Sequence, residues 1–261
     1  MTRNVLIAGS LGAALLLGAC NSDSSITSPG AVTAPPGTPA AGSWLGSIDS
    51  PTPGSRTARA VVLPDGSFWL VYSLEGDTST AGIIRGTGTT DGTNFTVTDA
   101  NLLSLEDGKQ TTADITATFV NKNSFAGTIT QDGSTALTSP AVFSSLYRTA
   151  FDTNLTLADL AGTYDGVITT KTGEETANFA ISDTGAIAGG STSGCSVAGQ
   201  ATAQSAGNVF NITATFGKED ACGANKDVSV VGILSLEVDT VTALALNGDS
   251  SNSFIFTGTR P

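Results

Sequence analysis

The sequence predicts an all-β protein made of two tandem, related antiparallel domains, each a small eight-stranded barrel or a sandwich. Apolar and polar residues alternate in short runs, as they do in strands that bury one face. Turn dipeptides such as Asp91-Gly92 and Asn247-Gly248 separate these runs. Residues 42–48 are similar to residues 162–168 at an offset of 120, and no stretch shows a sustained helical period.

The first nineteen residues predict an export signal. Arg3 gives the amino end a positive charge, and residues 5–17 follow without any charged side chain. This apolar run is shorter than the roughly twenty residues that cross a bilayer, and small residues follow it directly, as at a signal-peptide cleavage site. We therefore expect residues 1–19 to be a signal peptide that is removed.

The signal ends in Leu17-Gly18-Ala19-Cys20, which resembles the lipobox of bacterial lipoproteins. The resemblance implies that Cys20 receives a diacylglycerol thioether, that the chain is cut before it, and that the new amino group is acylated, for example with palmitate. Several acyl chains hold a protein to a membrane far more firmly than one. The alternative is an ordinary secretory signal with a chance cysteine. Asn21, where enterobacterial lipoproteins of the inner membrane carry Asp, implies an outer membrane lipoprotein that faces the periplasm or the cell surface.

Residues 20–41 predict a disordered tether behind the lipidated cysteine. Beyond Cys20 they are mostly Ser, Thr, Pro, Gly and Ala, with almost no bulky apolar side chains. Such a segment cannot bury enough apolar surface to order itself. We expect it to hold the folded part clear of the lipid headgroups.

The first domain is expected at residues 42–150, where the strand pattern is clear. Ile115, Ala117 and Phe119 alternate with polar residues. Residues 68–72 are apolar on both faces, so the face that does not fill the core must meet something besides water. That face carries either Trp69 and Val71 or Phe68, Leu70 and Tyr72. Two interpretations are open: packing against the other domain, or an exposed aromatic patch for a partner, with Trp69 and Val71 as possible partner-binding residues.

The second domain is expected at residues 156–261, and residues 155–160 predict one turn of helix where it begins. Residues 94–98 match residues 209–213 at an offset of 115, and residues 143–148 lie near residues 254–260 at 111 or 112. We attribute the drift to loops of unequal length. Residues 114–119 also match residues 211–216 at the conflicting offset of 97, which we interpret as convergence of strand patterns.

The cysteines predict one disulfide bond. With Cys20 assigned to lipid, only Cys195 and Cys222 remain, and an exported protein meets an oxidising compartment. Closing the loop between them should stabilise the fold by about 3 kcal/mol. A redox pair or a metal pair is the alternative, although neither has the close C-x-x-C spacing or additional ligands.

Composition argues against several classes of function. The formal net charge of −12 makes binding to nucleic acid unfavourable. Histidine is absent, which removes the usual general base and the commonest transition-metal ligand. We therefore expect no enzyme, no metal and no cofactor.

Two sequence features imitate known sites. Asp183-Thr184-Gly185 matches the sequence of an aspartic-protease catalytic loop. That chemistry needs two such aspartates, and the chain has no second Asp-Thr-Gly or Asp-Ser-Gly. We interpret it as a turn. The acidic pairs 106–107, 174–175 and 219–220 lack the spacing of a calcium loop and are expected to be solvated loop residues.

These observations together favour a membrane-anchored lipoprotein that acts as a non-catalytic binding module for a protein or an envelope component. A structural or assembly accessory of the envelope is the alternative. Two barrels on a lipid anchor resemble transferrin-binding and complement-binding surface lipoproteins, but only at the level of the fold and without a shared motif.

Overall fold

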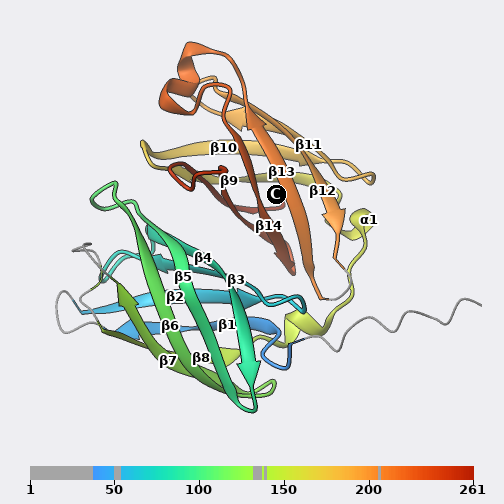
Figure 1. The fold of residues 1–261 in the computed structure, drawn as a ribbon. Coiled ribbons are helices and arrows are strands. Elements are labelled where there is room, and N and C mark those ends of the chain that lie inside the picture. Colours follow the sequence, from blue (N-terminus) through green and yellow to red (C-terminus); the bar gives the residue numbers. More distant parts are fainter. Residues whose placement is uncertain (1–37, 50–53, 132–136, 138–139, 205–206) are drawn as a thin grey trace, which may run out of the picture. The chain divides into compact units, whose positions relative to one another are not determined.

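The structure is a computed structural model that describes residues 38–49, 54–131, 137, 140–204 and 207–261. The expected signal peptide, Cys20 and all but the last residues of the expected tether lie outside the described residues. The described chain forms two closed eight-stranded antiparallel barrels in tandem, which Figure 1 shows as successive colour ranges. The predicted fold class is therefore confirmed, and both domains are barrels rather than sandwiches.

Sixteen strands build the two barrels. The first barrel consists of β1 (Gly42–Asp49), β2 (Ser55–Val62), β3 (Ser67–Ser73), β4 (Thr80–Asp91), β5 (Asn94–Ser104), β6 (Gln110–Val120), β7 (Ser124–Gln131) and β8 (Ala141–Tyr147). The second consists of β9 (Gly162–Thr170), β10 (Gly173–Ile181), β11 (Ala186–Ser191), β12 (Ser196–Ala203), β13 (Val209–Phe216), β14 (Ser229–Glu237), β15 (Thr240–Leu246) and β16 (Ser253–Thr259).

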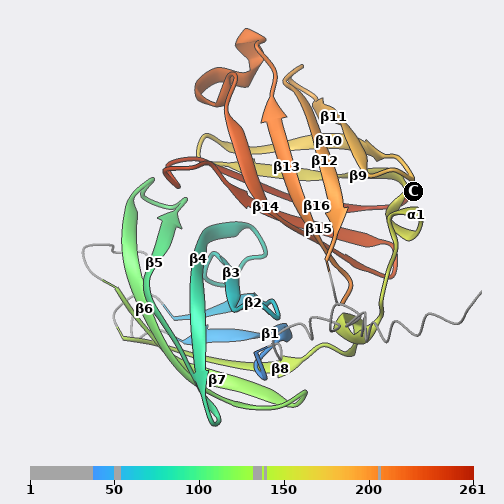
Figure 2. The same cartoon turned by 45° about the vertical axis from the view of Figure 1, so that its right-hand side comes forward.

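Each barrel closes because its first strand pairs with both its second and its last strand. β1 pairs with β2 and β8, and β9 pairs with β10 and β16. Figure 2 shows β14, β15 and β16 side by side in the second barrel. Closure leaves no unpaired sheet edge within either ring.

Aromatic side chains fill the barrel interiors. Because side chains alternate across a strand, every second residue points inward. In the first barrel, Phe125 packs against Trp44, Phe95 and Phe143 with ring centroids 5.4, 5.5 and 5.2 Å apart. In the second, Phe179 packs on Phe256 at 4.8 Å.

The strand registers coincide between the barrels. Ile48 lies opposite Phe143, and Ile168 lies opposite Phe256. β1 and β9 therefore correspond at the predicted offset of 120, whereas β8 and β16 correspond at 113 rather than at 111 or 112. The match at 97 would place the sixth strand of one barrel on the fifth of the other. That match is therefore convergent, as interpreted.

Two short helices, η1 (Thr149–Asp152) and α1 (Leu157–Leu160), connect the barrels. Thr156 donates its backbone N–H to Asp159 Oδ2 at 2.8 Å, which starts α1 where the sequence predicts one helical turn. Within the described ranges, no helix is long and apolar enough to cross a membrane.

The barrels also pack together through apolar side chains on their outer faces. Trp69 is 3% exposed and belongs to this cluster, whose buried members are Val61, Leu63, Trp69, Ile83, Leu103, Phe151, Val209, Ile233, Leu244, Leu246 and Ile255. Beside it, Glu237 Oε2 accepts from Arg59 at 3.1 Å and from Arg148 at 3.4 Å. Both barrels belong to one compact unit.

Candidate functional site

Each barrel has one end at which its first strand finishes and its second strand begins, and we call this end the mouth. At the first mouth the inward positions of β2 and β3 carry Arg56 and Tyr72. At the second mouth the inward positions of β10 and β11 carry Glu175 and Ser191. The inward side chains at the two mouths therefore differ in charge and in size.

A buried arginine fills the first mouth. Arg56 is 2% exposed, and its Nη1 lies 2.9 Å from Glu106 Oε2 while Nη2 donates to Oε1 at 3.2 Å. Nη1 also donates to the carbonyl oxygen of Ser73 at 3.0 Å. A guanidinium suits this position because its planar fork matches a carboxylate. The Arg56 guanidinium therefore supplies, from within the protein, the positive charge that neutralises Glu106.

Tyr72 completes the filling of the first mouth. The Arg56 guanidinium lies 5.8 Å from the centre of its ring. Burial is the main cause that raises the pKa of Tyr72, and the negative charge of the nearby Glu106 carboxylate raises it further. The Tyr72 hydroxyl therefore stays neutral. A Cβ at Gly82 would lie only 2.4 Å from the Tyr72 hydroxyl, so the ring fits because residue 82 is glycine.

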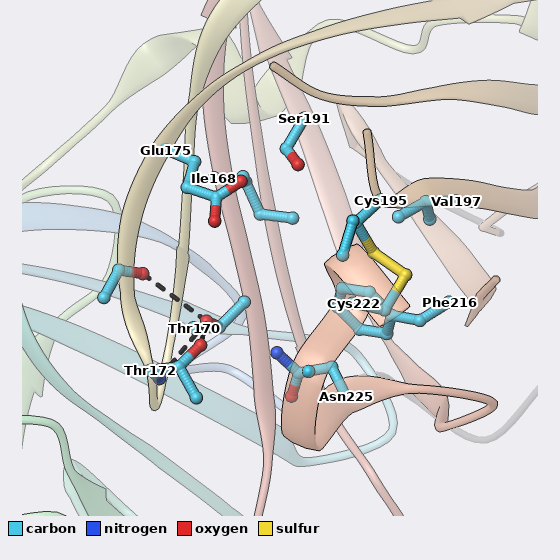
Figure 3. A pocket seen from close by; sticks show the side chains of 13 residues that line it. Ile168, Thr170, Thr172, Glu175, Ser191, Cys195, Val197, Phe216, Cys222 and Asn225 are labelled. Carbon is cyan, nitrogen blue, oxygen red and sulfur yellow. Dashed lines mark hydrogen bonds between the residues drawn. A yellow bond between two sulfur atoms is a disulfide. The ribbon is translucent and has the colours of Figure 1, made fainter. Parts of the chain in front are cut away.

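The second mouth contains a cavity of about 100 Å³. Ile168, Val197 and Phe216 form apolar walls, each less than 5% exposed. Figure 3 shows Glu175, Ser191, Thr170 and Asn225 around the same space as the disulfide. The site therefore combines an apolar floor with a few polar groups at its rim, which is the composition of small-molecule sites.

A disulfide bond holds one wall of this cavity. Cys195 and Cys222 are joined with an S–S distance of 2.03 Å, as predicted. The bond ties the turn before β12 to η2 (Asp220–Asn225), a short helix that the sequence analysis did not predict. It thereby fixes Asn225 at the cavity.

Asn225 has an unused hydrogen-bonding group. The residue is 4% exposed, and its Oδ1 has no hydrogen-bond partner in the described part of the chain. Figure 3 shows the amide nitrogen on the side that faces Thr170. A buried polar atom without a partner costs free energy, so a group that pairs with this amide would stabilise the site.

Glu175 provides the charge of the second mouth. Ser193 donates to its Oε2 at 2.7 Å. The hydroxyls of Ser191 and Ser193 lower the pKa of Glu175, so the carboxylate is ionised at neutral pH. Among the described residues, Glu175 forms no ion pair with any Lys or Arg.

The mouths occupy corresponding positions in the two barrels. Arg56 lies opposite Ile48, and Glu175 lies opposite Ile168. Tyr72 and Ser191 likewise lie opposite alanines of the neighbouring strand, Ala58 and Ala177. A cation and a large ring in one barrel are therefore replaced by an anion and a small hydroxyl in the other, which leaves the second mouth hollow.

The chain matches no protein-family model, and no curated protein matches it in sequence.

The suggested partner-binding residues lie at the junction of the barrels. Trp69 is buried, and the Arg85 guanidinium lies 4.8 Å from its ring centre. Val71 is half-buried and packs against the same apolar cluster. A second cavity of about 320 Å³ lies beside Trp69, lined by polar groups that include Asn101 and Asn211. Of the two open interpretations, domain packing describes Trp69, which forms no exposed aromatic patch.

The structure also shows where the acidic residues 174–175 and the triplet Asp183-Thr184-Gly185 lie. Gly185 has a φ of 84°, and its N–H bonds to the Ser182 carbonyl oxygen in the tight turn that was predicted. Glu174 and Glu175 lie in strand β10 rather than in a loop, which corrects the predicted location, and both are exposed, as predicted. Within the described ranges, no group of three or more His, Cys, Asp or Glu side chains could hold a metal ion.

The sequence analysis did not recognise Arg56 or Glu175, the two charged residues at inward mouth positions, as site residues. Arg56 precedes Ala58, Ala60 and Val62 at the same spacing of two, so an inward-facing charge was readable from the strand pattern. Glu175 precedes Ala177, Phe179 and Ile181 at the same spacing, so its inward position was readable in the same way, although it was interpreted only as part of an acidic pair in a loop.

Proposed function

We propose that the chain is an exported lipoprotein that acts as a non-catalytic binding module, with the mouth of the second barrel as its binding site. One observation carries this proposal: the inward positions that Arg56 and Tyr72 occupy in the first barrel carry Glu175 and Ser191 in the second, beside a cavity with apolar walls. The cavity that Arg56 lines in the first barrel, of about 440 Å³, is bordered mostly by polar residues. A cavity with apolar walls in one copy of a fold, at positions that larger side chains occupy in the other, favours a guest in that copy.

Export and anchoring are supported by the first twenty residues. The apolar run and the lipobox-like residues 17–20 favour attachment of lipid to Cys20, and Asn21 favours the outer membrane, facing either the periplasm or the cell surface. The disulfide bond supports an oxidising compartment. The guest would then be a component of the envelope or of its surroundings, or a group on a partner protein, rather than nucleic acid.

A binding role without catalysis is supported by the chemistry of the mouth. Glu175 is its one ionisable side chain; the other polar groups are hydroxyls and the Asn225 amide. Its lowered pKa makes it a weak base, and among the described residues no second acid or base lines the cavity to complete a proton transfer.

The test compares the wild-type protein with a variant whose mouth is filled. Ser191→Tyr adds in the second barrel the ring that Tyr72 provides in the first, and Thr202→Tyr adds the same ring on the outer face of β12. Each purified mature protein is incubated with an envelope extract and examined by native mass spectrometry. We expect a bound molecule on the wild type and on Thr202→Tyr that is absent from Ser191→Tyr. Equal retention by all three, or retention by none, would overturn the proposal.

The burial of Trp69 favours one other role. Without an exposed aromatic patch at this position, the chain could serve as a structural or assembly accessory of the envelope. Such a protein would co-purify with an envelope complex whether or not the second mouth is filled.

A further inference from the structure

We infer that the second mouth binds a small organic cation, namely a primary ammonium group attached to a short apolar chain. This inference rests on the proposed function and names the chemical class of the guest. It is carried by the contrast between Arg56 and Glu175 at corresponding positions of the two barrels.

Charge is the first step of the argument. In the first mouth, the carboxylate of Glu106 is neutralised by the built-in guanidinium of Arg56. In the second, Glu175 lies exposed at the rim of the cavity, where its carboxylate is ionised and forms no ion pair among the described residues. Lys171, in the turn before β10, lines a different cavity. A guest cation would take the place of the missing guanidinium.

Hydrogen bonding is the second step. An ammonium group has three N–H donors and no acceptor. Glu175 provides a carboxylate acceptor, and the hydroxyl oxygens of Thr170 and Ser191 lie around the same cavity. Rotation of the Asn225 amide about its last torsion would present the oxygen that now has no partner. The mouth thus has the acceptors that one ammonium group requires.

Shape is the third step. The apolar floor of Ile168, Val197 and Phe216 suits a hydrocarbon chain rather than a second charge. The volume of about 100 Å³ is smaller than the roughly 150 Å³ of a cavity that holds benzene. A chain of about four carbons therefore matches the site, and an anion of the same size would be repelled by Glu175.

The experiment uses n-butylammonium as the probe, with 1-butanol and butyrate as neutral and anionic probes of similar size. Binding to the mature protein is followed by NMR titration of the backbone amides. We expect n-butylammonium to shift the amides around Ile168 and Cys195, with an affinity at least tenfold higher than that of either other probe. Equal binding of 1-butanol, or shifts confined to another surface, would overturn the inference.

Variants separate charge from general effects on the fold. Glu175→Gln should weaken n-butylammonium binding at least tenfold. Glu174→Gln removes the same charge from the adjacent residue, which points to the other face of β10 and bonds to Thr169, so it should change binding less than twofold. Glu175→Arg should abolish binding because it places in the second mouth a cationic side chain like that of Arg56 in the first. Thermal unfolding of each variant verifies that it folds, and an unchanged affinity in folded Glu175→Gln would contradict the inference.

The two proposals can fail separately. If the envelope extract yields a guest that depends on Ser191 but n-butylammonium does not bind, the chemical class is wrong and the binding site stands. If no guest depends on Ser191 and no probe binds, both proposals fail.

Discussion

Glu175 stands in the second barrel at the strand position that Arg56 occupies in the first, each opposite an isoleucine of the preceding strand. The charge at this position is therefore inverted between two barrels with the same register. The first mouth contains both members of an ion pair. The second contains only the anion, beside a cavity.

Glu106→Gln tests the ion pair of the first mouth. The change leaves the Arg56 guanidinium buried without its counter-charge, which costs about 3 to 5 kcal/mol when both partners are fully buried. Because the Glu106 side chain is 26% exposed, we expect a loss of about 2 to 3 kcal/mol in the free energy of unfolding. Denaturation in urea measures it.

Lys109→Met is the matched control for that prediction. It breaks the ion pair with Asp107, in which the lysine side chain is 53% exposed, and should cost less than about 1 kcal/mol. Equal losses in the two variants would show that the first mouth is not held by its buried pair.

Tyr72→Phe tests the burial of the tyrosine through pH. Burial raises the pKa of Tyr72 above the value of about 10 in the unfolded chain, so its contribution to stability is present below about pH 10 and is lost as the pH rises further. Above that pH, the wild type should lose up to about 1.4 kcal/mol per pH unit more than the variant. Denaturation curves at several alkaline pH values measure the difference. Identical pH slopes would mean that the hydroxyl is solvated.

Cys195→Ser combined with Cys222→Ser tests the contribution of the disulfide bond. The bond closes a separation of 27 residues, and its removal should lower the free energy of unfolding by about 3 kcal/mol. Denaturation in urea again gives the value, and non-reducing mass spectrometry of the wild type should find the two cysteines linked. Two free thiols in the exported protein, or an unchanged stability, would be incompatible with this prediction.

Cys20→Ser tests the proposed anchor. Without the thiol there is no acceptor for the diacylglycerol group, so the chain should remain an unprocessed precursor or become a product without lipid. Metabolic labelling with a fatty acid measures the outcome. Persistence of the label in the variant would rule out attachment at this residue.

The fold could be predicted from the sequence because strand alternation is a local signal. The inward positions of Phe210, Ile212, Ala214 and Phe216 follow directly from a spacing of two. The choice between barrel and sandwich could not be predicted, since closure depends on pairing between β1 and β8, whose residues are about a hundred positions apart. The register of β16 was misplaced by one or two residues because Phe254 and Phe256 both face inward and fit either alignment.

The candidate site was much harder to predict. The disulfide followed from the number of cysteines and the expected compartment, but the cavity beside it depends on η2, which has no helical pattern of its own. Glu175 was expected to be solvated and is exposed, but its position in β10 beside the cavity was not predicted, because the residues around that cavity come from other strands. The second apolar face of residues 68–72 was correctly expected to meet something other than water, but the sequence left open which residues form it; Trp69 and Val71 do, at the junction of the barrels.

The most direct test of the central claim is a crystal structure of the mature protein soaked with n-butylammonium. We expect the nitrogen within hydrogen-bond distance of the Glu175 carboxylate and the hydrocarbon chain against Ile168 and Phe216. A structure in which the probe is absent from the second mouth at a concentration that saturates binding in solution would contradict the account.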